Sequence, residues 1–123
     1  VAGPNGPAAL ANLILLDQQN VDWIVEAIEH MRRNQLTAME PTPAAQEAWL
    51  ETIQALAQLT LVSKANTWYT GGNIAGKPRG LSMYTGGYLR YAEACRLAAE
   101  SYEAFQFKRL SAPAETRASE LAQ

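Results

Sequence analysis

Apolar residues recur at spacings of three, four and seven between residues 8 and 34, a period that gathers them on one face of an α-helix. The sequence therefore predicts a helix from about Ala8 to Asn34. Four consecutive polar residues, Asp17 to Asn20, interrupt this pattern, and a bend or break is expected there. The apolar stripe consists of Leu10, Leu13, Ile14, Val21, Ile24, Val25, Ile28 and Met31.

Two further helices are predicted beyond this first one. Thr42-Pro43 is a typical helix start, because threonine caps the free amides of a first turn and proline suits the first helical position. This helix is expected to end near Leu61. A third helix is expected to follow Gly86-Gly87, and its apolar face consists of Tyr88, Tyr91, Ala92, Cys95, Ala99 and Tyr102.

Three short segments are typical of extended structure, namely Leu36–Glu40, Leu81–Tyr84 and Phe105–Phe107. The strands expected near Val1, at Leu81–Tyr84 and at Phe105–Phe107 have no obvious partner in the chain, so they are expected to need strands from outside it. The fold class is predicted to be α/β, or α+β as an isolated piece, with about three helices and short strands. Residues 1–110 are expected to form the folded part, and the polar, alanine-rich residues 111–123 a flexible tail.

Composition narrows the range of partners. The 123 residues include 10 basic and 12 acidic side chains, and the basic residues cluster only at Arg32-Arg33, so no nucleic-acid-binding surface is expected. The longest apolar run, Leu13 to Leu16, is far too short to span a bilayer. The single cysteine, Cys95, excludes an intrachain disulfide and favours a reducing, cytoplasmic setting.

Motifs that carry catalysis or bind metals are not found in the sequence. Cys95 lies on an apolar helix face, which favours a buried structural thiol, and His30 is the only histidine, so no zinc site is expected. Gly76-Lys77-Pro78 lacks the Ser or Thr that ends a Walker phosphate loop, and no Gly-x-Gly-x-x-Gly is present. We expect no catalytic residue, no metal site and no complete dinucleotide-binding site in this chain.

The segment most typical of ligand binding spans residues 67–79, Thr-Trp-Tyr-Thr-Gly-Gly-Asn-Ile-Ala-Gly-Lys-Pro-Arg. Trp68 and Tyr69 stand at the head of this glycine-rich loop, and their rings can cover a ligand while their polar tips bind a ribose or phosphate. Lys77 and Arg79 offer positive charge to an anion. The alternative is that the two aromatic residues only anchor the loop in the core.

A second glycine- and proline-rich segment, Gly3-Pro4-Asn5-Gly6-Pro7, fits either a plain loop or a backbone that approaches a ligand closely. Both segments resemble the Baeyer–Villiger monooxygenase family. Residues 68–79 are similar to its Trp-Tyr-x-Gly-Ala-Asn-Ile-Pro-Gly-Lys-Pro-Arg stretch, with Gly72 in place of Ala and Ala75 in place of Pro. Residues 3–12 resemble its Gly-Pro-Gly-Ser-Pro turn and the start of the next helix. The match continues through Gln19–Trp23 and Tyr84–Cys95, and it covers about Gly3 to Phe107.

This resemblance implies that the chain is the C-terminal portion of the FAD-binding domain of a flavoprotein with two dinucleotide-binding domains. It implies FAD and NADP as cofactors of the intact enzyme, and residues 63–79 as a loop that covers the nicotinamide cofactor. The implied reaction inserts one oxygen atom from dioxygen beside a ketone carbonyl and gives an ester or lactone. The implied cofactor-binding residues are Gly3, Pro4, Leu13, Trp68, Tyr69, Asn73 and Lys77.

The implied partners are the remaining N-terminal part of the same enzyme and a small ketone, with no nucleic acid and no membrane. Two alternatives stay open from the sequence. One is a related flavin monooxygenase that oxidises amines or sulfides, and the other is a helical interaction module that does no chemistry. In either enzymatic case the chain by itself is expected to be inactive, because it holds no glycine-rich phosphate-binding motif.

Overall fold

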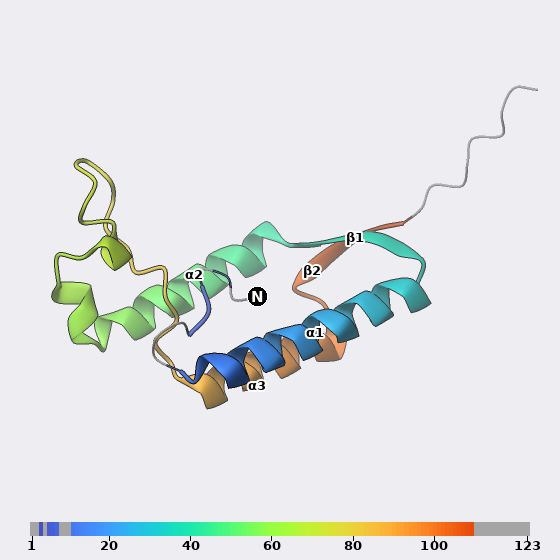
Figure 1. Cartoon of the computed structure of the whole chain (residues 1–123). Helices are drawn as coiled ribbons and strands as arrows, with labels where there is room; N and C mark the ends of the chain where they lie inside the picture. The colour runs from blue at the N-terminus through green and yellow to red at the C-terminus, as the bar shows by residue number, and fades with distance from the viewer. Residues whose placement is uncertain (1–2, 4, 8–10, 110–123) are drawn as a thin grey trace, which may run out of the picture.

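The computed structural model of the chain describes residues 3, 5–7 and 11–109. Its helices lie in two groups, with α1 and α3 side by side and α2 apart from them, and a two-stranded ribbon lies where α1 connects to α2 (Figure 1). The main elements in chain order are α1 (Leu13–Arg33), β1 (Leu36–Pro41), α2 (Pro43–Gln58), α3 (Tyr88–Ser101) and β2 (Phe105–Arg109). Two short 3₁₀ helices, η2 (Leu61–Lys64) and η3 (Trp68–Thr70), lie between α2 and α3.

Helix α1 begins where a side chain satisfies its free amides. The Asn12 side-chain oxygen accepts hydrogen bonds from the backbone N–H groups of Ile14 and Leu15, at 3.0 and 3.4 Å. The helix was expected to begin near Ala8, but residues 11 and 12 are not helical, so this part of the prediction is wrong. Residues 8–10 lie outside the described part of the chain.

The break expected as one possibility in the middle of α1 does not occur, because the helix continues through residues 17–20. Asp17 is exposed at the surface, while Asn20 is buried and its side-chain oxygen accepts a hydrogen bond of 3.0 Å from the Tyr91 hydroxyl. Polar residues in a helix end it only when they leave their groups unpaired. Here the side chain of Asp17 is exposed to solvent, and the side chain of Asn20 has a hydrogen-bond partner in α3.

The predicted start of the second helix is confirmed. The Thr42 hydroxyl accepts a hydrogen bond from the N–H of Ala45 at 3.2 Å, and Pro43 occupies the first helical position. The helix ends at Gln58, slightly before the predicted limit near Leu61, and the chain tightens into η2. The third helix follows Gly87 as predicted, and Gly87 has a positive φ of 80° that favours glycine.

The predicted strand at Phe105–Phe107 has a partner inside the chain, so the expectation that it needs an outside strand is wrong. Strand β2 pairs antiparallel with β1, with Met39 opposite Phe107 and Pro41 opposite Phe105. The two strands are far apart in the sequence, and the pairing closes around α2, the loop and α3. The strand near Val1 lies outside the described residues.

The predicted strand at Leu81–Tyr84 does not form, and Leu81, Met83 and Tyr84 are buried in irregular chain instead. The Gln54 side-chain amide donates a hydrogen bond of 2.8 Å to the Leu81 carbonyl, and the Tyr84 N–H donates one of 3.1 Å to the Gly6 carbonyl. Leu81 and Met83 pack with Ala57 of α2 in a small core cluster. Burial against α2, rather than strand pairing, therefore holds this segment in place.

Aromatic side chains join α1, α3 and β2. The Trp23 indole N–H donates a 2.9 Å hydrogen bond to the Cys95 carbonyl of α3, and its ring lies 5.8 Å from that of Phe105. Tyr102, buried at the end of α3, lies 4.1 Å from the His30 ring, which also faces Phe107 at 5.5 Å. These contacts hold the ribbon against the helix pair.

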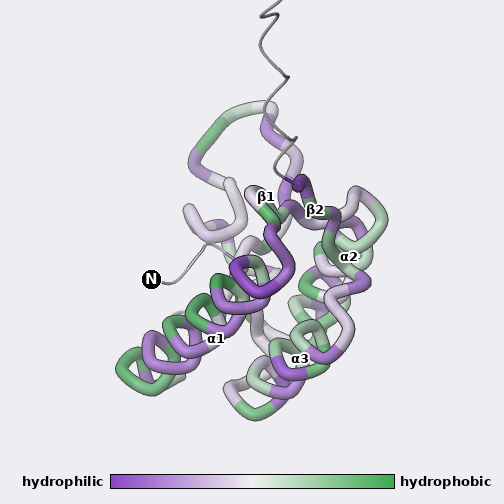
Figure 2. The backbone as a smooth tube through the Cα atoms, turned by 90° about the vertical axis from the view of Figure 1, so that its right-hand side faces the viewer, coloured by the Kyte–Doolittle hydropathy of each residue, from purple (hydrophilic) through white to green (hydrophobic). Residues whose placement is uncertain are grey.

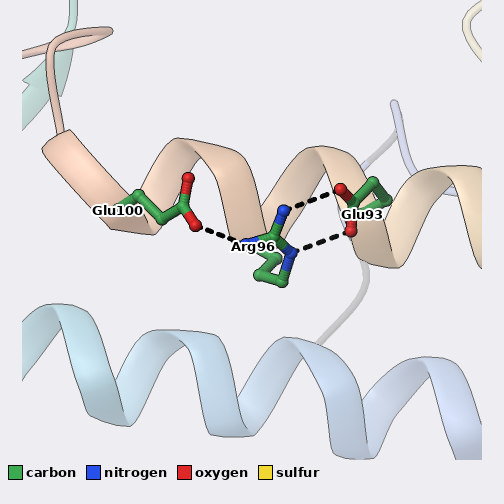
Figure 3. A network of polar contacts seen from close by, with 3 residues as sticks. All are labelled: Glu93, Arg96 and Glu100. Carbon is green, nitrogen blue, oxygen red and sulfur yellow. Dashed lines mark hydrogen bonds and ion pairs between the residues drawn. The ribbon is translucent and has the colours of Figure 1, made fainter.

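An exposed ion-pair network lies along α3. Arg96 lies between Glu93 and Glu100 and makes hydrogen bonds to both carboxylates, with a distance of 2.7 Å from Arg96 Nη2 to Glu93 Oε1 (Figure 3). Hydrogen bonding to Arg96 lowers the pKa of the Glu93 carboxyl. The three side chains are exposed, so the network supports the helix only modestly and marks this face as solvated.

Candidate cofactor-binding segments

The loop between α2 and α3 projects beyond the end of α2, away from the other helices (Figure 1). Hydrogen bonds close it at its base. The Thr70 hydroxyl donates to the Thr67 carbonyl at 2.9 Å, the Gly72 N–H donates to the same carbonyl at 3.0 Å, and the Gly80 N–H donates to the Thr70 carbonyl at 3.3 Å. Thr70 is buried, so the loop is fixed at its base while residues 73–80 remain exposed.

The two aromatic residues of the loop have different environments. Their rings stack with centroids 3.8 Å apart. Tyr69 is half-buried and packs against the cluster of Ala57, Leu81 and Met83, whereas Trp68 is 68% exposed. Tyr69 therefore helps to anchor the loop on the core, whereas Trp68 is not a core anchor. The indole of Trp68 lies on Tyr69 with much of its surface exposed.

The polar residues of the loop lie on its exposed side. Asn73 and Lys77 are both exposed, and the Lys77 aliphatic chain lies against Gly71, whose φ of 71° is in the left-handed region. Arg79 donates a hydrogen bond of 3.2 Å to the Asn66 side-chain oxygen. Trp68, Tyr69, Asn73 and Lys77 thus share one loop, which carries both cationic side chains and an exposed indole.

Gly72 has a steric reason to be glycine in this chain. A Cβ atom added at this position would overlap the Oδ1 atom of Asn66, the same atom that accepts from Arg79. The alanine that the family resemblance suggests here would therefore require Asn66 to move. Glycine at position 72, where the family stretch has alanine, therefore leaves room for the Asn66 side chain to accept the hydrogen bond from Arg79.

The glycine- and proline-rich turn forms a separate segment. The Gly6 N–H donates a 3.2 Å hydrogen bond to the Gly3 carbonyl, Gly6 and Pro7 are buried, and Gly3 is exposed. Pro4 lies outside the described residues. Leu13, the first residue of α1, is 55% exposed. The turn is connected to the loop indirectly, through the hydrogen bond from Tyr84 to Gly6 and the segment of residues 81–84.

A mostly apolar cavity of about 640 Å³ lies between the three helices, and the turn forms part of its wall. Trp23, Trp49 and Tyr91 line it together with Gly3 and Gly6. Sequence reasoning did not identify this cavity, because its walls come from segments that are distant along the chain. The aromatic content of the three helices was the only signal of it.

The ionisable groups around this cavity stay neutral at physiological pH. Burial raises the pKa of the Cys95 thiol and also that of the Tyr91 phenol, which lies beside it and donates to Asn20. A thiol and a phenol with raised pKa values are poor nucleophiles and bases at neutral pH. In the described ranges no group of three His, Cys, Asp or Glu side chains gathers as metal ligands would. None of the described helices has the length and apolar character needed to cross a membrane.

The three-helix arrangement, the loop and the turn together match one class of protein, the flavin-dependent monooxygenases. No protein-family profile matches the chain. Among solved structures, that of a cyclohexanone monooxygenase from Rhodococcus sp. Phi1 bound to NADP⁺ superposes with a TM-score of 0.77 at 35% identity, covering 87% of this chain and 20% of that one. The structure of an OTEMO complex with FAD and NADP gives a TM-score of 0.63 at 28% identity over 72% of this chain and 16% of that one.

The curated relatives place the chain more closely within this class. An acetone monooxygenase (methyl acetate-forming) of Gordonia sp. (strain TY-5) is 43% identical over 99 residues, which are 80% of this chain and 19% of the relative. A phenazine N-monooxygenase of Lysobacter antibioticus is 35% identical over 106 residues, 85% of this chain and 19% of the relative. The chain is a homologue of the Baeyer–Villiger monooxygenases, which confirms the resemblance drawn from its motifs, and it spans about one fifth of the length of these relatives.

Proposed function

We propose that this chain is the C-terminal, cofactor-covering segment of an FAD- and NADPH-dependent Baeyer–Villiger-type monooxygenase. The observation that carries the proposal is similarity to enzymes of this type over most of the chain, including an NADP⁺-bound structure at 35% identity. The intact enzyme would insert one oxygen atom from dioxygen into a ketone. Its remaining N-terminal part would be the direct partner of this segment. The single Cys95 supports a cytoplasmic location.

The loop has the properties that a nicotinamide cofactor requires of a covering segment. Trp68 presents an exposed ring and a donor-only indole N–H, which suits a ribose hydroxyl oxygen as acceptor. Lys77 is exposed on the same loop and suits a phosphate. Tyr69 fixes the position of Trp68 by stacking against it and packing against the core. We assign NADP to Trp68, Tyr69, Asn73 and Lys77.

The turn has the properties that suit the flavin side of the site. Gly3 is exposed and carries no side chain, so a planar ring can approach its backbone closely. We assign FAD to Gly3, Pro4 and Leu13. The pyrophosphate would be bound elsewhere in the enzyme, because the Asn12 side chain already occupies the first amides of α1. When bound, the two cofactors supply the reducing electrons and the activated oxygen.

The contribution of this chain to the reaction is to position the cofactor and to exclude water. A loop that is fixed at Thr70 and exposed at its tip can lie over a bound nucleotide without disturbing the helices. Closing a site in this way strengthens the electrostatic interactions inside it and prevents side reactions with water. Residues 1–110 are proposed as the structural unit that does this, and residues 111–123 as its tail.

The similarity to a phenazine N-monooxygenase favours oxidation at nitrogen, instead of beside a ketone carbonyl, as the second candidate, and the related oxidation of sulfides is tested with it. Both functions need the same cofactors, so this segment does not separate them. The test is to purify the full-length enzyme and supply matched ketone, amine and sulfide substrates with NADPH. We expect a flavin absorption band and conversion of the ketone to an ester or lactone. Formation of N-oxide or sulfoxide without ester would favour the second candidate, and a protein without flavin would refute both.

A further inference from the structure

One side chain connects the two ends of the loop at residues 67–79. The side-chain oxygen of Asn66, Oδ1, accepts a hydrogen bond of 3.2 Å from Nη2 of Arg79, which lies 13 residues further along the chain. The same oxygen lies so close to the backbone of Gly72 that a Cβ atom added there would overlap it. Asn66 therefore contacts the middle of the loop and its last residue at the same time.

The turn that Asn66 contacts also sets the direction of Trp68. The Gly72 N–H donates a hydrogen bond of 3.0 Å to the Thr67 carbonyl, which closes the turn around Trp68. The Trp68 ring stacks on that of its neighbour Tyr69, and the described core cluster includes Tyr69 but not Trp68. A ring that does not pack in the core takes its direction from its backbone. Contacts that fix this turn therefore fix where the Trp68 ring points.

The charge of this region has one sign. Residues 52–92 contain four basic side chains and neither Asp nor Glu, although the whole chain has a net charge of −2. The loop is mostly hydrophilic or neutral in hydropathy (Figure 2). The ion pairs of the described residues lie elsewhere, along α3 and across the ribbon. The acceptor for Arg79 is thus a neutral amide, which holds the guanidinium in place and leaves its positive charge uncompensated.

We propose that Asn66 is a positioning residue of the cofactor-covering loop. It accepts from Arg79 while it lies against Gly72, and so it holds the cationic end of the loop beside the turn that carries Trp68. Because the acceptor is neutral, the charge of Arg79 stays available for an anionic group of the nicotinamide cofactor, such as a phosphate. This inference rests on the proposed function, since it takes the loop as the covering segment. It adds Arg79 to the residues that attract the cofactor, and Asn66 acts through Arg79.

Two substitutions at position 66 separate the hydrogen bond from the charge. Asn66→Ala removes the acceptor. Asn66→Asp keeps an acceptor of the same shape but places a negative charge beside Arg79. Gln58→Ala is the matched control, because it removes an exposed amide at the end of α2, outside the loop, and Gln58 is assigned no cofactor contact. Each variant is prepared as the full-length, FAD-loaded enzyme.

Four quantities are measured for each variant: the dissociation constant of NADP⁺ at low and high salt, the share of NADPH consumed without product, the rate of proteolytic cleavage within residues 67–79, and the melting temperature. Asn66→Ala should raise the cleavage rate and the uncoupled share of NADPH, with an unchanged melting temperature, because Asn66 and Arg79 are both exposed. Asn66→Asp should leave the cleavage rate unchanged. It should weaken NADP⁺ binding by about threefold or more at low salt, and less at high salt, because ions screen the added charge.

Combination with Arg79→Met tests whether Asn66 acts through Arg79. If it does, Asn66→Ala causes no further loss of NADP⁺ affinity once Arg79 is replaced. An undiminished further loss would overturn the positioning role, and so would NADP⁺ binding and coupling that stay at the parent values in both Asn66 variants. A lower melting temperature of Asn66→Ala with normal NADP⁺ binding would show a merely structural residue. In each of these cases an enzyme that holds FAD and oxidises its ketone leaves the proposed function standing, whereas a parent enzyme without flavin refutes that function.

Discussion

Replacement of Trp68 separates a cofactor-binding residue from a structural one. Trp68 is 68% exposed, so about a third of its surface is covered, which is roughly 80 Å² for a tryptophan that can bury up to about 250 Å². At about 25 cal/mol per Å², Trp68→Ala costs at most about 2 kcal/mol of folding free energy. Its ring contact is Tyr69, the next residue, which stays nearby in the unfolded chain, so we expect about 1 kcal/mol or less.

The effect on NADPH should be larger than the effect on stability. Trp68→Phe keeps an aromatic ring and removes the indole N–H, so it should weaken NADPH binding by about 1 kcal/mol, a factor of about five. Trp68→Ala also removes the ring that covers the cofactor. It should weaken binding further and increase the share of NADPH that is consumed without product, because an incompletely covered site admits water.

The assay compares the dissociation constant of NADPH, the ratio of product formed to NADPH consumed, and the melting temperature in the full-length enzyme. Ile74→Ala is the matched control, because Ile74 is an apolar residue of the same loop, is 51% exposed, and is assigned no cofactor contact. It should leave both NADPH binding and coupling unchanged. If a folded Trp68→Ala enzyme binds NADPH as tightly and remains as well coupled as the parent, Trp68 does not cover the cofactor and the assignment of this loop is wrong.

Three further predictions concern the loop, the cavity and the chain by itself. Gly72→Ala should displace Asn66, break its hydrogen bond to Arg79 and increase proteolytic cleavage within residues 67–79. Gly76→Ala is the control, because a Cβ at position 76 would meet no neighbour although φ there is positive. It should leave the Asn66–Arg79 hydrogen bond intact in a crystal structure. The raised pKa values of Cys95 and Tyr91 mean that the folded state retains these protons longer than the unfolded state does. Their contribution to stability should therefore be complete below about pH 8.5 and decline as the pH rises above it. The urea concentration at the unfolding midpoint should decrease as the pH is raised from about 8 to about 10.5. A midpoint that stays constant over this range would contradict the prediction. The isolated 123-residue chain should retain no flavin through gel filtration and should self-associate, because aliphatic side chains of α1 are exposed; a monomer with a sharp thermal transition would refute this.

Local features of the sequence were sufficient for the helices and for the family. Thr42 and Pro43 cap α2 by interactions within one turn, and Gly87 before α3 permits the positive φ that the start of this helix requires. The motifs at residues 3–12 and 68–79 resemble those of the family, and the relatives confirm that resemblance. Such features can be predicted because the groups that satisfy each other are only a few residues apart.

Tertiary structure alone decided which strands pair, which residues are buried and what remains exposed. The pairing of Met39 with Phe107 depends on α1 and α3 packing together, and the sequence pattern of either strand contains no trace of its partner. Asn20 continues its helix because Tyr91, distant in the sequence, donates to it. Trp68 and Tyr69 are adjacent and chemically similar, yet only Tyr69 packs on the core, because burial depends on what the rest of the fold places beside each side chain.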